Sequence, residues 1–262
     1  MAKAATATYV YCAVAAPRAP KLSRVAAGLP GAGRVRLLDL DRGLYLVVAD
    51  VPLARYGEAA IQRGLSDLDW VARAAVAHEA VIESFIDATA VLPMKLFTIF
   101  NSEERALAHV RADRPRIDSL VKRLANHHEW GVRVVLDRTR AIKAARPARA
   151  TVSTPSGAAY LSRKKAQRDA SIELAERARD AVGALYDRLA AASRLARRRG
   201  SGELPAQSAQ GGSLLLDAAF LVRRSRSKSF RALAEREARA LSHGGYGLTL
   251  SGPWPPYTFV QD

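Results

Sequence analysis

The sequence predicts an α+β fold, and three observations carry that prediction. Short runs rich in aromatic and β-branched residues are typical of strands. Longer stretches repeat their apolar residues at helical spacing. In the second half, the expected order of strand, long helix, strands, helix and strand is compatible with a ferredoxin-like half. A chain of 262 residues is long enough for one large domain or two of ordinary size.

The first half opens with expected strands. Tyr9–Val14 has the aromatic and β-branched content of a strand. Val35–Leu40 and Leu44–Val48 are two more, joined by the short segment Asp41–Gly43. A short connection that contains glycine favours a hairpin between the two runs.

Helices are expected to follow. Ser66 and Asp69 have the spacing of a capping box at the start of the first. Shorter helices are expected from near Ser102 and near Pro115. The first helix is expected to bury one stripe of residues, formed by Leu68, Val71, Ala75, His78, Ile82, Phe85 and Ile86.

The second half begins with an expected strand over Trp130–Leu136, followed by a loop over 139–157. A long helix is predicted over 158–199, with a seam of mostly small residues at coiled-coil spacing. Later strands are expected at Leu214–Val222 and Tyr246–Leu250, with a helix between them. The seam residues are Ala175, Ala178, Val182, Leu185, Leu189, Ala192 and Ala196.

The composition is that of a globular protein, with 49% hydrophobic and 25% charged residues. The sequence contains no apolar run of the roughly 18 residues that a membrane span needs. A single cysteine, Cys12, excludes an internal disulfide framework and suits a reducing compartment. We therefore expect a cytoplasmic protein with no membrane partner.

Net charge is the unusual bulk property, at +16, which favours contact with an anionic partner. Between Arg140 and Arg199 stand fifteen basic residues and five acidic ones, so this stretch carries +10. A basic track for nucleic acid is one interpretation. The other is a solvated helix face, because acidic residues are interspersed and only Tyr160 and Tyr186 are available for stacking. A high genomic GC content would also enrich a chain in Ala and Arg.

Residues that carry catalytic or metal chemistry are not arranged in recognisable motifs. His78-Glu79 lacks a second histidine four residues on, where Ile82 stands. The sequence has no Gly-x-Ser-x-Gly elbow and no Gly-Lys-Ser/Thr phosphate loop. Cys12 lies inside an expected strand, where a buried thiol is the usual state. The sequence therefore predicts neither an enzyme nor a cofactor or metal site.

The C-terminal tail concentrates proline and aromatic residues. Pro253, Pro255 and Pro256 favour an extended backbone, and Trp254, Tyr257 and Phe259 present large rings. These rings either fold back onto the core or form a surface for a partner, and the two roles are compatible.

This tail, Ser251–Val260, resembles the C-terminal signature of the GvpL/GvpF family of gas vesicle proteins. Val91–Phe100 resembles the central Leu-Pro-Met-Arg-Phe-Gly-Thr-Val-Phe motif of that family. The chain departs from the motif at Lys95, where arginine is usual, and at Leu96-Phe97, where Phe-Gly is usual. Further segments agree in the same order, namely Tyr9–Val14, His78-Glu79, Glu129–Val132, Gly157–Leu161 and Ala219–Val222.

The resemblance implies two α+β domains, which we place at 1–127 and 128–262, the second a modified ferredoxin-like fold with the long basic helix and the aromatic tail. It implies an accessory role in gas vesicle assembly, in the cytoplasm and at the gas vesicle, as a holdase or nucleation factor. The expected partners are the small hydrophobic shell protein and other accessory proteins, and a nucleic-acid-binding protein is the alternative. The expected partner-binding residues are Met94, Lys95, Trp254, Tyr257 and Phe259.

Overall fold

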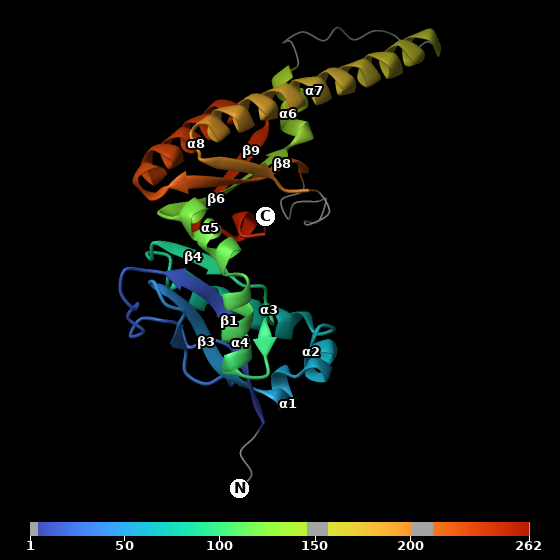
Figure 1. Cartoon of the computed structure of the whole chain (residues 1–262). Coiled ribbons are helices and arrows are strands. Elements are labelled where there is room, and N and C mark those ends of the chain that lie inside the picture. The colour runs from blue at the N-terminus through green and yellow to red at the C-terminus, as the bar shows by residue number, and fades with distance from the viewer. Residues whose placement is uncertain (1–4, 146–156, 201–211, 262) are drawn as a thin grey trace. The chain divides into compact units, whose positions relative to one another are not determined.

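The computed structural model describes residues 5–145, 157–200 and 212–261 of the chain (Figure 1). The chain forms two compact units. The first consists of Met1–Glu129 together with Pro253–Asp262, and the second of Trp130–Gly252. The predicted division at 127/128 differs in one respect that matters: the tail groups with the first unit. In the described residues, no helix is long and apolar enough to cross a membrane.

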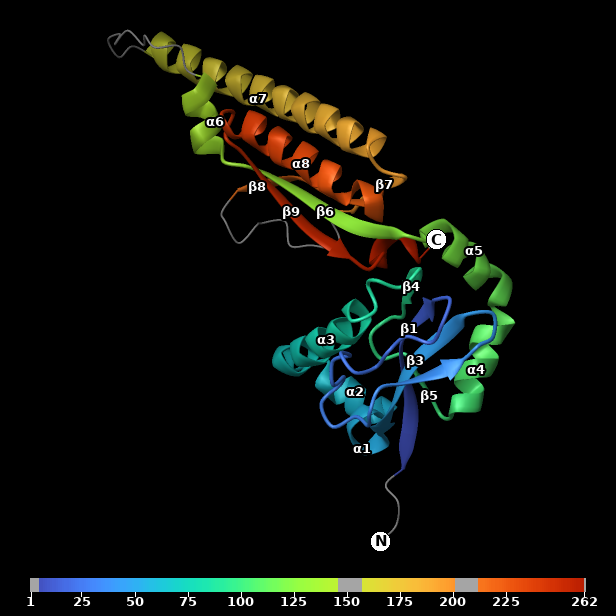
Figure 2. The same cartoon turned by 90° about the vertical axis from the view of Figure 1, so that its left-hand side faces the viewer.

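The first unit contains an antiparallel sheet with the strand order β2-β3-β1-β4, in which β5 also pairs with β1. The central strand β1 has nine of its ten residues buried. Figure 2 shows α3 and α4 on either side of these strands. The elements are β1 (Thr6–Ala15), β2 (Arg36–Asp39), β3 (Leu44–Pro52), α1 (Leu53–Tyr56), α2 (Glu58–Gly64), α3 (Leu68–Glu83), β4 (Ala90–Pro93), β5 (Ile99–Phe100), α4 (Glu103–Ala112) and α5 (Arg114–Leu124).

The predicted hairpin is present between β2 and β3, with Asp39 opposite Tyr45. Three of the four residues between the strands adopt the left-handed conformation, with φ of 67° at Asp41, 55° at Arg42 and 73° at Gly43. Only glycine adopts this conformation without steric cost. A side chain at Gly43 would also meet the carbonyl oxygen of Ala16 at 2.6 Å.

The start and the buried face of α3 differ from the prediction. The cap is Asp67, whose side chain accepts hydrogen bonds from the backbone N–H groups of Asp69 and Trp70, and not Ser66. Leu68, predicted to be buried, is 81% exposed. The helix buries Ala74, His78, Val81 and Ile82, so its apolar stripe is rotated from the predicted one. The two shorter helices begin as predicted: Ser102 caps α4, and Pro115 lies in the first turn of α5.

The second unit has a four-stranded sheet in the order β7-β8-β6-β9. Helices α7 and α8 cover one face of it (Figure 2). Trp130 and Val132 of β6, Phe220 of β8 and Phe230 of α8 belong to its core. The elements are β6 (His127–Leu136), α6 (Arg138–Ala145), α7 (Gly157–Ala191), β7 (Leu195–Arg198), β8 (Ser213–Arg223), a 3-10 turn (Arg224–Arg226), α8 (Ser227–Ser242) and β9 (Tyr246–Trp254). A second 3-10 turn, Tyr257–Phe259, lies in the tail and so belongs to the first unit.

The predicted long helix over 158–199 is present but ends at Ala191, and Leu195–Arg198 is a strand paired with β8. Pairing with a distant strand overrides the helical pattern there, because tertiary contacts outweigh the intrinsic helix propensity of a short segment. Only part of the seam is buried, at Ala178, Val182, Leu185 and Leu189. The expected loop contains helix α6 up to Ala145, and residues 146–156 lie outside the described ranges.

Candidate functional site

The C-terminal tail folds back onto the core of the first unit, as one of the two interpretations of its aromatic residues predicted. Phe259 is 2% exposed, and Pro255 and Pro256 are buried. Tyr257 packs against the core formed by β1, β3 and α3. Burial raises the pKa of the Tyr257 hydroxyl, and the carboxylates of Glu79 and Glu83 add to that rise.

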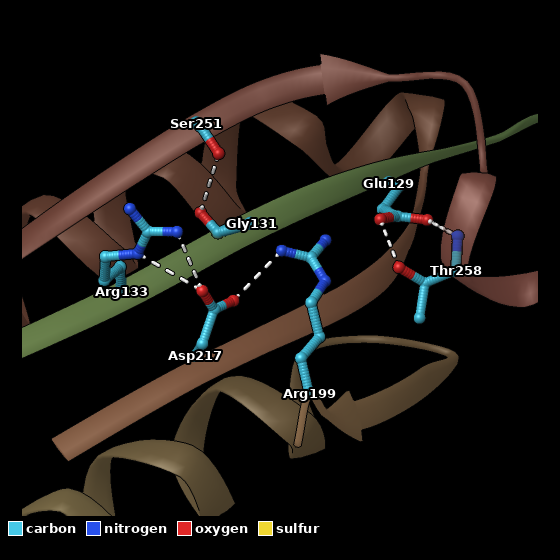
Figure 3. Close-up of polar contacts among 7 residues, drawn as sticks. All are labelled: Glu129, Gly131, Arg133, Arg199, Asp217, Ser251 and Thr258. Atoms are coloured by element: carbon cyan, nitrogen blue, oxygen red, sulfur yellow. Dashed lines mark hydrogen bonds and ion pairs between the residues drawn. The ribbon is translucent and has the colours of Figure 1, made fainter. Parts of the chain in front are cut away.

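Polar groups clamp the tail to its own unit. The carboxylate of Glu129, which is 2% exposed, accepts hydrogen bonds from the backbone N–H and from the Oγ1 hydroxyl of Thr258, each at 2.7 Å (Figure 3). Arg123 Nη2 donates to the carbonyl oxygen of Phe259 at 2.8 Å. Hydrogen bonds to an ionised group are stronger than neutral ones, so the buried carboxylate is a main anchor of the tail.

A groove of about 690 Å³ in the first unit is lined mainly by three segments, and His109 of α4 and Arg116 of α5 complete the lining. The three segments are His78 and Glu79 on α3, the residues Pro93–Leu96 at the end of β4 and after it, and Tyr257 and Val260 of the tail. Each of these three segments belongs to one of the motifs that carry the family resemblance. The groove therefore brings the tail motif together with two motifs that lie more than a hundred residues earlier in the sequence.

His78 holds the groove together and is fully hydrogen-bonded. The Tyr9 hydroxyl lies 2.8 Å from Nδ1 of His78, and Nε2 lies 3.1 Å from the carbonyl oxygen of Met94. Tyr9 accepts a hydrogen bond from the Phe97 N–H at 3.2 Å, so its own proton is available for Nδ1. This network assigns the proton to Nε2, the neutral tautomer. Burial lowers the pKa of His78, which agrees with a neutral ring.

Met94 and Lys95 reach the groove from a fixed backbone. The Met94 N–H donates to the carbonyl oxygen of Tyr11 at 3.0 Å, and the carbonyl oxygen of Lys95 accepts from Thr98. The Lys95 side chain is exposed, and within the described ranges no hydrogen bond or ion pair of its ammonium group occurs. The site thus presents a flexible thioether beside a solvated positive charge.

Phe97 occupies a strained position at the edge of this segment. Its φ is 64°, in the left-handed region that favours glycine, and the family motif has glycine at this point. The ring stacks on Trp70 with centroids 5.1 Å apart and planes 18° apart. Ring stacking therefore accompanies the backbone strain that the substitution introduces.

A second polar cluster lies in the second unit. Asp217 on β8 is buried and accepts at Oδ2 from Nε and Nη2 of Arg133, at 3.2 and 3.0 Å, and at Oδ1 from Nη1 of Arg199 at 3.0 Å (Figure 3). Gly131 leaves room beside the cluster, since a side chain there would lie 2.6 Å from the Ser251 Oγ. Two guanidinium groups on one buried carboxylate leave the cluster with one net positive charge.

The predicted partner-binding residues have different surroundings. Met94, Lys95 and Tyr257 line the one groove. Phe259 is in the core, and Trp254 at the end of β9 is 38% exposed and not part of the groove lining. Their role in partner binding stays a prediction. Neither spacing nor periodicity in the sequence indicated the Glu129–Thr258 clamp or the Arg133–Asp217–Arg199 cluster.

Other reactive groups belong to the core. Cys12 is completely buried, and burial raises the pKa of its thiol. Across the part of the chain that the structure describes, no group of three or more His, Cys, Asp or Glu residues is placed to hold a metal ion.

Comparison with known proteins gives one consistent relationship. The model of the family described as "Gas vesicle synthesis protein GvpL/GvpF" matches residues 7–261. The chain is 31% identical over 220 residues to gas vesicle protein L of Streptomyces sp. (strain CB03234), covering 83% of this chain and 80% of that protein.

Two crystal structures of gas vesicle protein GvpF share the fold. For the protein from Anabaena sp. PCC7120 the TM-score is 0.69 at 15% identity, with 98% of this chain and 97% of that chain covered. For the protein from Microcystis aeruginosa the TM-score is 0.67 at 14% identity, with 98% and 99% covered.

Proposed function

Since this chain belongs to the GvpL/GvpF family of gas vesicle synthesis proteins, we propose that it is a non-catalytic assembly factor that binds the small hydrophobic shell protein of the vesicle. In this role it acts as a holdase or nucleation factor, in the cytoplasm and at the growing gas vesicle. Other accessory proteins of the vesicle are further proposed partners.

The observation that carries the proposal is the groove of the first unit. Three segments that resemble family motifs meet there, and the tail segment lies far from the other two in the sequence. The lining combines the apolar groups of Met94, Leu96 and Val260 with the charged groups of Glu79, Lys95 and Arg116. Pockets that combine apolar walls with a few polar groups are typical binding sites.

The chemistry of the partner fits such a groove. A hydrophobic shell subunit exposes apolar surface before it assembles, and exposed apolar surface leads to aggregation. A groove with a methionine in its wall adapts to apolar side chains of different shapes, because methionine is flexible and polarisable. The solvated ammonium group of Lys95 adds attraction for an acidic residue beside the apolar segment.

We also propose that the two compact units are the two domains, and that the second is a modified ferredoxin-like domain. The order β6, α7, β7, β8, α8, β9 with β6 and β8 at the centre of the sheet supports this assignment. The tail is then assigned to the first domain, because it anchors there through Glu129 and Arg123.

Nucleic-acid binding remains the alternative, favoured by the charge of the second unit. Residues 130–252 contain 24 Lys and Arg against 10 Asp and Glu, a net +14. The long helix α7 is not the source of this charge, since it has 7 basic and 5 acidic residues. An interaction of this kind would weaken steeply as salt is added.

The test is a pull-down of the shell protein by the purified full chain at low and high salt. We expect capture that persists at high salt, because apolar contact is not screened. Met94→Asp should reduce the capture about tenfold or more, because it puts a charge in the groove wall. The matched control is Val76→Asp on α3, at a position 67% exposed and outside the groove lining, which should capture normally.

Two results would reject the proposal. Capture of DNA at low salt with no capture of the shell protein would favour the alternative. Equal losses for Met94→Asp and Val76→Asp would remove the groove as the binding site.

A further inference from the structure

The sheet of the second unit ends in two very different edge strands, β7 and β9. β7 has four residues, two of which are arginine. β9 has nine residues, Tyr246–Trp254, and none of them is charged. Its first proline is Pro253, close to its end. The two edges of one sheet are therefore protected unequally.

Unprotected edge strands are rare in isolated proteins. An edge presents unpaired N–H and C=O groups, and most edges are shortened, charged, bulged or interrupted by proline so that other chains do not pair with them. β7 follows this rule. From Tyr246 to Gly252, β9 has none of the protecting residues, and within the described ranges no further strand pairs with its outer side.

The side chains of β9 alternate between the core and the solvent. Tyr246, Leu248 and Leu250 pack against the core beneath α8. Gly247, Thr249 and Ser251 alternate with them, are exposed and are small. The strand thus has one apolar face packed in the core, one face of small exposed residues, and an outer edge that no described strand covers. Peptides add a strand to a sheet at edges of this kind.

We propose that the outer edge of β9 pairs with an extended segment of a partner protein that is uncharged or acidic. This inference is independent of the groove and of the shell protein as its ligand. Apolar residues on one side of the added segment would extend the core next to Leu248 and Leu250, and polar residues on the other would continue the row of Thr249 and Ser251.

Charge decides between a foreign partner and a second copy of this chain. Two copies joined edge to edge would bring two units of net +14 together, with their edge strands about 4.8 Å apart. The charges lie on the neighbouring strands and helices and not on β9, so the repulsion acts between the two whole units and weakens as salt is added. Arg133 on the adjacent strand β6 adds a positive charge that Asp217 fixes in place. Neutral or acidic segments meet no such repulsion.

Disulfide exchange at the edge tests the proposal, since it measures weak pairing. The full chain carries Thr249→Cys, and its native Cys12 does not compete because it is completely buried. The probe is a synthetic peptide of about nine residues, matched to the length of β9, with alternating Leu and Thr and Glu at both ends. Its one cysteine is a mixed disulfide with glutathione, so that the thiolate introduced by Thr249→Cys attacks the peptide sulfur and glutathione leaves as the thiol. Two further forms are N-methylated on odd or on even residues, so that each lacks the donors of one edge.

We expect one methylated form to exchange as well as the parent peptide and the other about tenfold less, because only one peptide edge faces β9. This difference should persist at high salt. A peptide with Lys at its ends should exchange several-fold less at low salt only. Ser171→Cys, on the exposed part of α7, is the control and should not distinguish the methylated forms.

Equal exchange of the two methylated forms with Thr249→Cys would overturn the proposal, as would the same preference at Ser171→Cys. Light scattering of the unmodified chain tests whether a second copy of the chain pairs with β9 instead. We expect a monomer, and a dimer that Thr249→Lys dissociates would assign the edge to a second copy instead.

Discussion

The two units of this chain differ sharply in charge although both combine an antiparallel sheet with helices. The first contains 17 basic and 15 acidic residues, a net +2, and the second 24 and 10, a net +14. The groove lined by family motifs is in the nearly neutral unit. The high net charge of the whole chain therefore comes from the second unit, and the unit that contains the groove is nearly neutral.

The buried carboxylates show the same contrast at the level of single residues. Glu129 in the first unit is bound by a backbone N–H and a hydroxyl of Thr258. Asp217 in the second is bound by the guanidinium groups of Arg133 and Arg199. Thr258 therefore binds the Glu129 carboxylate with neutral donors of the tail, whereas Asp217 neutralises part of a basic surface.

The largest expected effect tests this contrast. Asp217→Asn should destabilise the second unit by about 2–3 kcal/mol, because two guanidinium groups lose their counter-charge. Glu129→Gln should cost the first unit about 1–2 kcal/mol, since an amide oxygen still accepts one of the two hydrogen bonds. Hydrogen exchange followed by mass spectrometry assigns each loss to its unit.

The salt dependence of the two stability losses tests the same contrast. The loss in Asp217→Asn should shrink at high salt, because Arg133 is 45% exposed and its attraction is screened, whereas the loss in Glu129→Gln should not change. Equal salt dependence in the two variants would contradict the contrast.

The next largest effect on stability is expected at Phe97, in the loop beside the groove. Phe97→Gly and Phe97→Ala both lose the stacking on Trp70, but only glycine relieves the left-handed backbone at φ 64°. We expect the glycine variant to be more stable than the alanine variant by about 1 kcal/mol, the reverse of their usual order. Urea unfolding measures the difference, and an alanine variant as stable as the glycine variant would show that the position is unstrained.

Substitution of Tyr257 is expected to raise the stability of the first unit and not to lower it. Its hydroxyl is buried and has no hydrogen-bond partner in the part of the chain that the structure describes. Tyr257→Phe should therefore raise the stability of the first unit by up to about 1 kcal/mol. The control Tyr56→Phe should lower it by a similar amount, because that hydroxyl donates to the carbonyl oxygen of Pro30 at 2.8 Å. Thermal unfolding that moves in the same direction for both variants would refute this prediction.

The smallest effect is a pH dependence from His78. Burial lowers its pKa in the folded state, so below about pH 6.5 the unfolded chain binds a proton that the folded chain does not. The contribution to stability is complete above that pH and is lost as the pH falls toward the folded pKa. Urea midpoints measured between about pH 7 and 5.5 should fall, and the slope should be smaller in His78→Gln. An unchanged slope would assign the pH dependence to other groups.

Most local signals in the sequence predicted the local features, although the cap of α3 is Asp67 and not Ser66. Asp41–Gly43 indicated the hairpin, Ser102 the start of α4, and the position of Cys12 in a strand its burial. Each of these depends on residues within a few positions of one another. The end of α7 was wrong because Leu195–Arg198 becomes a strand only through pairing with β8, more than twenty residues later.

The candidate site was predictable in part. Motif resemblance singled out Met94, Lys95 and Tyr257, which line one groove. It also singled out Phe259 and Trp254, which do not. Periodicity and spacing could not place the tail, because its anchor Glu129 lies 129 residues before Thr258. Contacts between such distant residues leave no pattern in a single sequence.

The return of the tail to the first unit has a consequence for synthesis in the cell. The second unit, residues 130–252, is an insertion within the first, so 123 residues separate the two pieces that must combine. At ordinary translation rates the ribosome needs on the order of ten seconds to make them. During that interval the nascent first unit lacks Pro253–Val260, and its seat for Tyr257 and Phe259 is empty. Assembly of the first unit therefore finishes only with a segment that is made after the whole of the second unit.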